Sequence, residues 1–164
     1  MRGITPNLWF DDEAEAAAEF YCEVFDDAEI GQVMRYGEAT EEVSGKEPGS
    51  VMTVSWRIGD TQFVGINGGP QFKFSEAISF EIRCEDQDEV DYFWEKLTAD
   101  GGAESACGWC KDRFGVSWQV VPEGLNELLS EGDAERIERA TAAMLKMRKL
   151  DIAELRRAAD GVAA

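Results

Sequence analysis

The chain has 164 residues, of which 16 are lysine or arginine and 34 are aspartate or glutamate, so its formal net charge is −18. This acidic excess argues against nucleic acids and anionic membranes as partners, because phosphate groups need a basic surface to meet them. The chain has no histidine, which removes imidazole both as a catalytic base and as a metal ligand.

The first part of the chain contains one predicted helix among predicted strands. Apolar residues alternate over residues 4–10, which predicts a strand. Residues 13–25 have the periodicity of a helix with one apolar face. That face is formed by Ala17, Phe20, Tyr21 and Val24. Further strands are predicted over residues 29–36, 50–58 and 62–66.

Two connections between these strands differ in character. Residues 37–49 are polar and acidic, which predicts a long loop. Gly59 and Asp60 form a dipeptide that is typical of a tight hairpin turn.

The same order of elements then starts again. A strand is predicted over residues 77–84, a helix over 87–97, and strands over 107–111 and 116–121. The apolar face of the second helix is formed by Val90, Phe93, Trp94 and Leu97, and a shift of 73 residues aligns it with the first helix. We interpret this as a weak internal repeat. Coincidence between two amphipathic helices is the alternative.

The last forty residues are predicted to be helical. A short helix covers residues 125–129, and Asp133 is an N-cap candidate for a helix that continues to Met147. Its apolar stripe is Ile137, Ala140, Met144 and Leu145. Asp151 and Glu154 have capping-box spacing for a final helix through Ala159. We expect this tail to pack either on its own sheet or on a partner subunit.

The sequence also bears on location and solvent. No segment approaches the roughly 20 apolar residues of a membrane span, and the N-terminus has no apolar signal core, so a cytoplasmic protein is expected. Its cysteines are then expected to be reduced thiols. The acidic excess is explained either by adaptation to a salt-rich cytoplasm or by a cationic partner.

Several segments resemble the PhnB-like family. They are residues 4–11 (ITPNLWFD), 67–74 (NGGPQFKF), 76–80 (EAISF), 107–119 (CGWCKDRFGVSWQ) and the tail from Met144 to Leu155. The resemblance covers nearly the whole chain. This family belongs to the vicinal oxygen chelate superfamily, with the glyoxalases, extradiol dioxygenases, and bleomycin and fosfomycin resistance proteins.

The resemblance implies an α+β fold of paired βαβββ modules (glyoxalase/bleomycin resistance-like) with a helical C-terminal extension, usually in a homodimer. The expected boundaries are residues 1–75 for the first module, 76–124 for an incomplete second module, and 125–164 for a helical extension that completes or crosses the dimer. The family is often labelled demethylubiquinone methyltransferase. That activity needs a glycine-rich strand-to-helix turn, whereas the first strand runs into Asp11, Asp12 and Glu13.

No metal or cofactor is predicted. Superfamily enzymes hold a divalent ion with His and Glu, and the resemblance places the ligand positions around Thr5 to Asn7 and at Ile78 or Ser79. Neither region has an imidazole or a carboxylate. Cys107 and Cys110 have C-x-x-C spacing, but they precede an expected hairpin, so packing cysteines are favoured over a redox dithiol.

Aromatic residues on the predicted strands suggest a pocket for a small apolar or planar ligand. An ordinary core or a dimer seam is the alternative for the same residues. The expected ligand-binding residues are Trp9, Trp56, Asn67, Phe72, Phe74, Ser79, Trp109, Lys111 and Trp118, with Ser117 as a further polar group.

The charged residues offer two weak catalytic candidates. Lys111, Asp112 and Arg113 either pair with one another or leave Lys111 to meet an anion or act as a base. Glu76 is the best single carboxylate for acid–base chemistry. The sequence therefore favours a small-molecule binding protein without a His-ligated metal, with an enzyme of unknown reaction and a structural dimer as alternatives.

Overall fold

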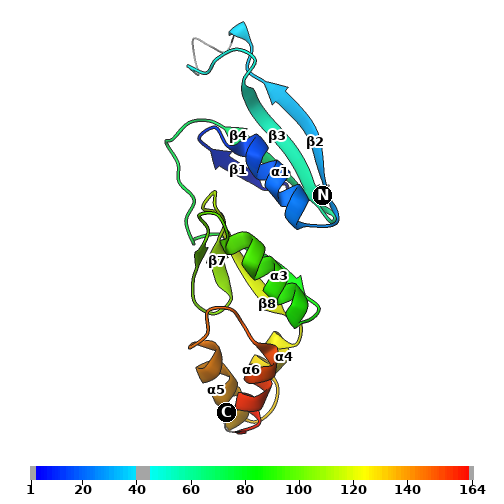
Figure 1. The fold of residues 1–164 in the computed structure, drawn as a ribbon, viewed down its shortest axis with the longest axis vertical. Helices are drawn as coiled ribbons and strands as arrows, with labels where there is room; N and C mark the ends of the chain where they lie inside the picture. The colour runs from blue at the N-terminus through cyan, green and yellow to red at the C-terminus, as the bar shows by residue number, and fades with distance from the viewer. Residues whose placement is uncertain (1–2, 40–44, 163–164) are drawn as a thin grey trace. The chain divides into compact units, whose positions relative to one another are not determined.

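The computed structural model describes residues 3–39 and 45–162, which form two compact units divided between Phe74 and Ser75 (Figure 1). Each unit has a four-stranded sheet with a helix on one face, in the order βαβββ. The α+β fold of paired modules is confirmed. The loop expected over residues 37–49 includes residues 40–44, which lie outside the described residues.

The first unit consists of β1 (Asn7–Phe10), α1 (Ala14–Val24), β2 (Ala28–Arg35), β3 (Val51–Ile58) and β4 (Thr61–Asn67), with the sheet order β1-β4-β3-β2. β1 is parallel to β4, and the other neighbours are antiparallel. The predicted face of α1 is buried against the sheet. Gly65 lets α1 approach closely, because a Cβ atom there would lie 2.9 Å from Cβ of Ala14.

The second unit repeats this order with β5 (Phe80–Cys84), α3 (Gln87–Thr98), β6 (Ala103–Glu104), β7 (Trp109–Lys111) and β8 (Ser117–Pro122). Its sheet order is β5-β8-β7-β6. The short strand β6, which the sequence analysis does not predict, adds a fourth strand to this sheet. The Trp94 indole on α3 donates a hydrogen bond to the Glu104 carboxylate at 2.9 Å, which ties β6 to α3.

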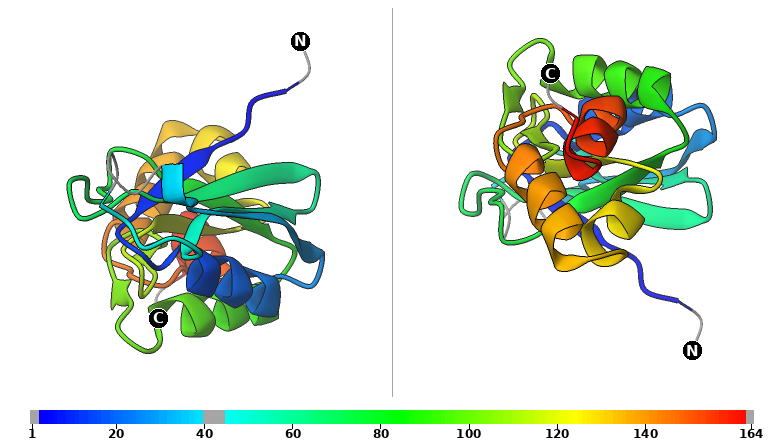
Figure 2. Two further views of the ribbon diagram at one scale, coloured as in Figure 1. Left: turned by 90° about the horizontal axis from the view of Figure 1, so that it is seen from above. Right: turned by 90° about the horizontal axis from the view of Figure 1, so that it is seen from below.

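The C-terminal helices α4 (Leu125–Ser130), α5 (Ala134–Met144) and α6 (Ile152–Ala159) pack on one another (Figure 2). Asp133 and Asp151 cap α5 and α6 as predicted, each accepting a hydrogen bond from a backbone amide three residues on. The expected apolar stripe of α5 is partly wrong, because α5 ends at Met144 and Leu145 is exposed. The tail packs within its own unit, where Val121 of β8 contacts the helix cluster. Packing on a partner subunit stays a prediction.

The α5–α6 linker, residues 145–151, attaches these helices to the rest of the second unit. The amides of Cys107 and Gly108 donate to the carbonyls of Met147 and Arg148 at 2.9 and 2.7 Å. A side chain at position 108 would contact Leu150, and the backbone φ of +81° at Gly108 also favours glycine. The linker therefore runs beside the segment that leads into β7.

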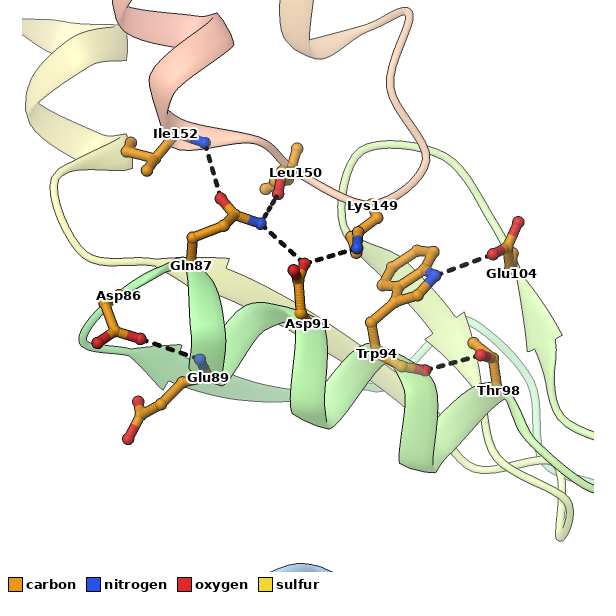
Figure 3. A network of polar contacts seen from close by, with 10 residues as sticks. All are labelled: Asp86, Gln87, Glu89, Asp91, Trp94, Thr98, Glu104, Lys149, Leu150 and Ile152. Carbon is orange, nitrogen blue, oxygen red and sulfur yellow. Dashed lines mark hydrogen bonds and ion pairs between the residues drawn. The ribbon is translucent and has the colours of Figure 1, made fainter.

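A polar network on α3 completes this attachment (Figure 3). The Gln87 side chain donates to the Leu150 carbonyl at 3.0 Å and accepts from the Ile152 amide at 3.1 Å. Asp91 pairs with Lys149 at 2.5 Å. The hydrogen bond from Lys149 lowers the pKa of Asp91, with Gln87 as the next cause. Two successive turns of α3 thus hold the linker and the start of α6.

We expect Gln87→Ala to loosen the C-terminal helices. The substitution removes the partners of one amide and one carbonyl, so the free energy of unfolding should fall by about 1–2 kcal/mol. Hydrogen exchange should accelerate at the Ile152 amide and along α6. Glu95→Ala, at an exposed position on the same helix, is the matched control. Unchanged exchange at Ile152 in Gln87→Ala would contradict this account of the attachment.

None of the described helices is both long enough and apolar enough to cross a membrane.

Candidate functional site

Strand register decides which face of a sheet each predicted site residue occupies. Residues directly opposite on neighbouring strands share a face, and successive residues alternate between faces. In each unit one face is covered by α1 or α3. We call the other face of each sheet its distal face.

Trp56 and Asn67 lie on the α1 side of the first sheet and not on its distal face. Trp56 is buried and stacks against Tyr21 of α1, with ring centroids 5.6 Å apart. Asn67 accepts a hydrogen bond from the Ala14 amide at 2.8 Å and donates to the Val51 carbonyl at 3.1 Å. Its role is to cap the start of α1.

Trp9 lies on the distal face of the first sheet. Ile66 on β4, Thr53 on β3 and Met34 on β2 lie in one row with Trp9 across the sheet and share this face. The Trp9 indole donates to the Gly69 carbonyl at 2.9 Å. Its ring lies against Gly68, where an added Cβ atom would come within 2.0 Å of a ring carbon. The glycine pair after β4 therefore fixes the position of Trp9.

Phe72 and Phe74, in the loop after β4, contact different aromatic residues. Phe72 contacts the Trp9 ring edge-on at 5.1 Å and is 63% exposed. Phe74 contacts Phe10, which is buried on the α1 side. The structure thus brings together Trp9 and Phe72 but not Phe74.

In the second unit, Trp118 lies on the α3 side and not on the distal face. It is buried beside Phe80, with ring centroids 5.5 Å apart. Its indole donates to the Asp112 carboxylate at 2.8 Å. Trp118 belongs to the core that α3 covers.

The distal face of the second sheet collects the other predicted residues of this unit. Trp109 is opposite Gln119, and Lys111 is opposite Ser117. The Gln119 side chain donates to the Ser79 hydroxyl at 2.9 Å. The full set on this face is Ser79, Glu81, Arg83, Trp109, Lys111, Ser117, Gln119 and Val121. Gln119 was not predicted, although its position two residues after Ser117 is the signal that could have found it.

Ser117 differs from the other polar groups on this face. Its side chain is 2% exposed, and its hydroxyl has no hydrogen-bond partner in the described part of the chain. Burying a hydroxyl without a partner costs roughly 1–3 kcal/mol. An unpaired buried group of this kind calls for an explanation, and a ligand is one.

The two weak catalytic candidates pair with each other. Lys111 Nζ lies 2.6 Å from Glu76 Oε1. The hydrogen bond from Lys111 is the largest cause of a lowered pKa at Glu76, followed by a backbone hydrogen bond. Because the carboxylate is held in its ionised form, Glu76 is a weak general base.

Lys111, Asp112 and Arg113 each have partners outside this group of three charges. Lys111 pairs with Glu76, and Arg113 lies 3.6 Å from Asp100. Asp112 instead accepts hydrogen bonds from the Phe114 and Val116 amides and from Trp118. The three charges therefore have three different roles in the β7–β8 turn.

The cysteines support packing rather than redox chemistry. Cys107, Cys110, Cys22 and Cys84 are all free thiols. Cys110 faces the α3-side core, where burial raises the pKa of its thiol to about 12. A thiol so difficult to ionise is a poor nucleophile.

A hollow of about 310 Å³ adjoins the distal face of the second sheet at the ends of β5 and β8. It shares Glu81, Arg83 and Val121 with that face. The other lining residues are Cys84, Glu85, Pro122, Glu123, Gly124, Leu125, Asn126 and Glu127. Trp109, Lys111 and Ser117 do not line this hollow.

Comparison with known proteins places this architecture in a family. The sequence model of the 3-demethylubiquinone-9 3-methyltransferase family matches residues 2–121. The chain belongs to this family. A PhnB protein from Bacillus cereus, given as a candidate 3-demethylubiquinone-9 3-methyltransferase, is 30% identical, with a TM-score of 0.63. That match covers 73% of this chain and 98% of the relative.

Two fosfomycin resistance proteins share the PhnB-like fold at lower identity. FosX from Mesorhizobium loti is 18% identical with a TM-score of 0.55, and the match covers 80% of this chain and 99% of that one. FosX from Listeria monocytogenes is 17% identical with a TM-score of 0.54, and the match covers 79% and 97%. The PhnB-like chain therefore shares its fold with these fosfomycin resistance proteins. No curated protein matches it.

The family's methyltransferase label implies a methyl-donor cofactor, which the residues of the first unit do not fit. A nucleotide-type cofactor is usually held at a glycine-rich turn before a helix N-terminus. Here the turn before α1 carries Asp11, Asp12 and Glu13, and the Ala14 amide is already bonded to Asn67.

The residues at the expected ligand positions do not fit the divalent metal that the superfamily resemblance implies. On the distal face, the expected ligand position at Ser79 carries a hydroxyl that accepts from Gln119. Asn7, at the other position, donates to the Thr5 carbonyl. Within residues 3–39 and 45–162, no three Asp, Glu or Cys side chains gather to hold a metal ion. These neutral groups are a poor donor set for a divalent cation.

Proposed function

We propose that the protein binds a small planar molecule on the distal face of the second sheet. The observation that carries this proposal is the buried, unpartnered hydroxyl of Ser117. A ligand that accepts a hydrogen bond there removes the cost of leaving the hydroxyl unpaired.

The neighbours of Ser117 suit a planar ligand. Trp109 is half-buried on the same face and offers an aromatic surface. The Gln119 amide and the Ser79 hydroxyl provide polar groups within one strand of Ser117. This combination of an aromatic wall with a few polar groups is typical of small-molecule sites.

The test is a thermal-shift screen with small planar aromatic compounds, neutral and anionic, including benzamide and benzoate. We expect at least one compound to raise the melting temperature in proportion to its binding. Ser117→Ala should weaken its binding roughly tenfold, because one hydrogen bond is lost. The same variant should make the unliganded protein at least as stable as the original, since it removes a buried hydroxyl that has no partner.

Ser130→Ala, at an exposed hydroxyl on α4, is the matched control and should leave binding unchanged. The proposal fails if no compound raises the melting temperature. It also fails if Ser117→Ala and Trp109→Ala both bind as tightly as the original protein.

A further inference from the structure

The distal face of the second sheet holds a lysine whose present partner is easily replaced. Lys111 Nζ lies 2.6 Å from Glu76 Oε1, yet the Glu76 side chain is 63% exposed, against 34% for Lys111. Glu76 lies in the turn just before β5. Exposed ion pairs are weak in water, so exchanging this carboxylate for another costs little.

Lys111 and Ser117 can both bind one polar group of a ligand. They are directly opposite each other on antiparallel strands β7 and β8. Directly opposite side chains have Cβ atoms roughly 4.5–5.5 Å apart. One carboxylate could therefore pair with the ammonium group through one oxygen and accept from the Ser117 hydroxyl through the other.

The other charges on this face leave Lys111 as the cation for an incoming anion. Arg83 is opposite Val121, which is four residues along β8 from Ser117, so it is not beside the Ser117 hydroxyl. Glu104, on the neighbouring strand β6, is bonded to Trp94 and Arg148. The only partner recorded for Lys111 among the described residues is Glu76.

We propose that the ligand of this face is a planar monocarboxylate, whose carboxylate replaces that of Glu76 at Lys111 and accepts a hydrogen bond from Ser117. This inference rests on the proposed function and adds the chemical class of the ligand. Glu76 then acts as an internal competitor that occupies the anion position when no ligand is bound.

The experiment compares benzoate with benzamide, which have the same ring and nearly the same shape but differ in charge. Affinities are measured by isothermal titration calorimetry on the full chain. We expect the original protein to bind benzoate more tightly than benzamide. Lys111→Met should weaken benzoate at least tenfold and leave benzamide unchanged, whereas Lys111→Arg should retain the preference.

The Glu76→Gln variant tests whether the Glu76 carboxylate competes with the ligand for Lys111. Removing the competing carboxylate should raise benzoate affinity about threefold to fivefold, with no change for benzamide. Glu95→Gln changes the net charge equally on the exposed side of α3 and should have no such effect. Equal melting temperatures of the variants check that each has folded.

The outcomes separate the two proposals. If benzamide binds as well as benzoate and Lys111→Met changes neither, the carboxylate inference is wrong while binding on this face stands. If neither compound binds to the original protein or to Glu76→Gln, and the wider screen also finds no ligand, both proposals are wrong.

Discussion

Replacing Asp112 with alanine should lower the free energy of unfolding by about 3–5 kcal/mol. The Asp112 side chain is 2% exposed and accepts three hydrogen bonds in the β7–β8 turn. Alanine would leave the Phe114 and Val116 amides and the Trp118 indole without this acceptor. Buried donors that lose their acceptor account for the size of the effect.

Urea unfolding followed by tryptophan fluorescence measures this loss. Asp112→Asn keeps one carbonyl oxygen and should lose about half as much stability. Glu138→Ala, at an exposed position on α5, should change the stability by less than about 0.5 kcal/mol. If Asp112→Ala were no less stable than Glu138→Ala, the turn would not depend on this carboxylate.

Thermal stability should increase strongly with salt. The net charge is −18, and the Debye length falls from about 10 Å at 0.1 M salt to about 3 Å at 1 M. Screening should therefore remove most of the repulsion between carboxylates. We expect the melting temperature to rise by roughly 5 °C over this range, which corresponds to about 2 kcal/mol for a chain of this size.

Helix α1 offers a variant that separates screening from other effects of salt. Glu15, Glu19 and Glu23 follow one another at intervals of four residues, and the last turn has no basic residue. Glu23→Lys puts a cation at the C-terminal end of the helix and beside Glu19. It should raise the melting temperature in low salt, and the gain should shrink in high salt.

Melting curves in increasing KCl test both statements, together with the expectation that the acidic excess is an adaptation to high salt. A melting temperature that does not change with KCl would contradict adaptation to high salt as the reason for the acidic excess. A gain from Glu23→Lys of equal size at all salt concentrations would show that repulsion is not what the substitution relieves.

Sequence periodicity predicts the helix faces of this protein well. Ala17, Phe20, Tyr21 and Val24 are buried as predicted, because a period of 3.6 residues allows only one apolar face. The strand boundaries are less exact. β1 begins at Asn7 rather than Ile4, and its pairing with β4 starts at the Pro6 carbonyl, which accepts from the Val64 amide.

The side of a sheet on which each tryptophan lies could not be predicted in the same way. Alternation assigns Trp9 and Trp56 to faces of their own strands, but it does not say which face meets the helix. Hydrogen bonds and ion pairs between residues far apart in the chain could not be predicted from the sequence either. The cap that Asn67 provides to Ala14 spans 53 residues, and the Lys111–Glu76 pair spans 35. β6, with two residues, is too short to show any period.

The attachment of the α5–α6 linker has a thermodynamic consequence for the distal face of the second sheet. The linker carbonyls hold the Cys107 and Gly108 amides, immediately before the strand that carries Trp109 and Lys111. The family model ends at residue 121, so this support comes from outside the part of the chain matched to the family. Linkage is reciprocal: if loss of the last two helices weakens binding at β7, a ligand bound there must raise the free energy of opening those helices by the same amount.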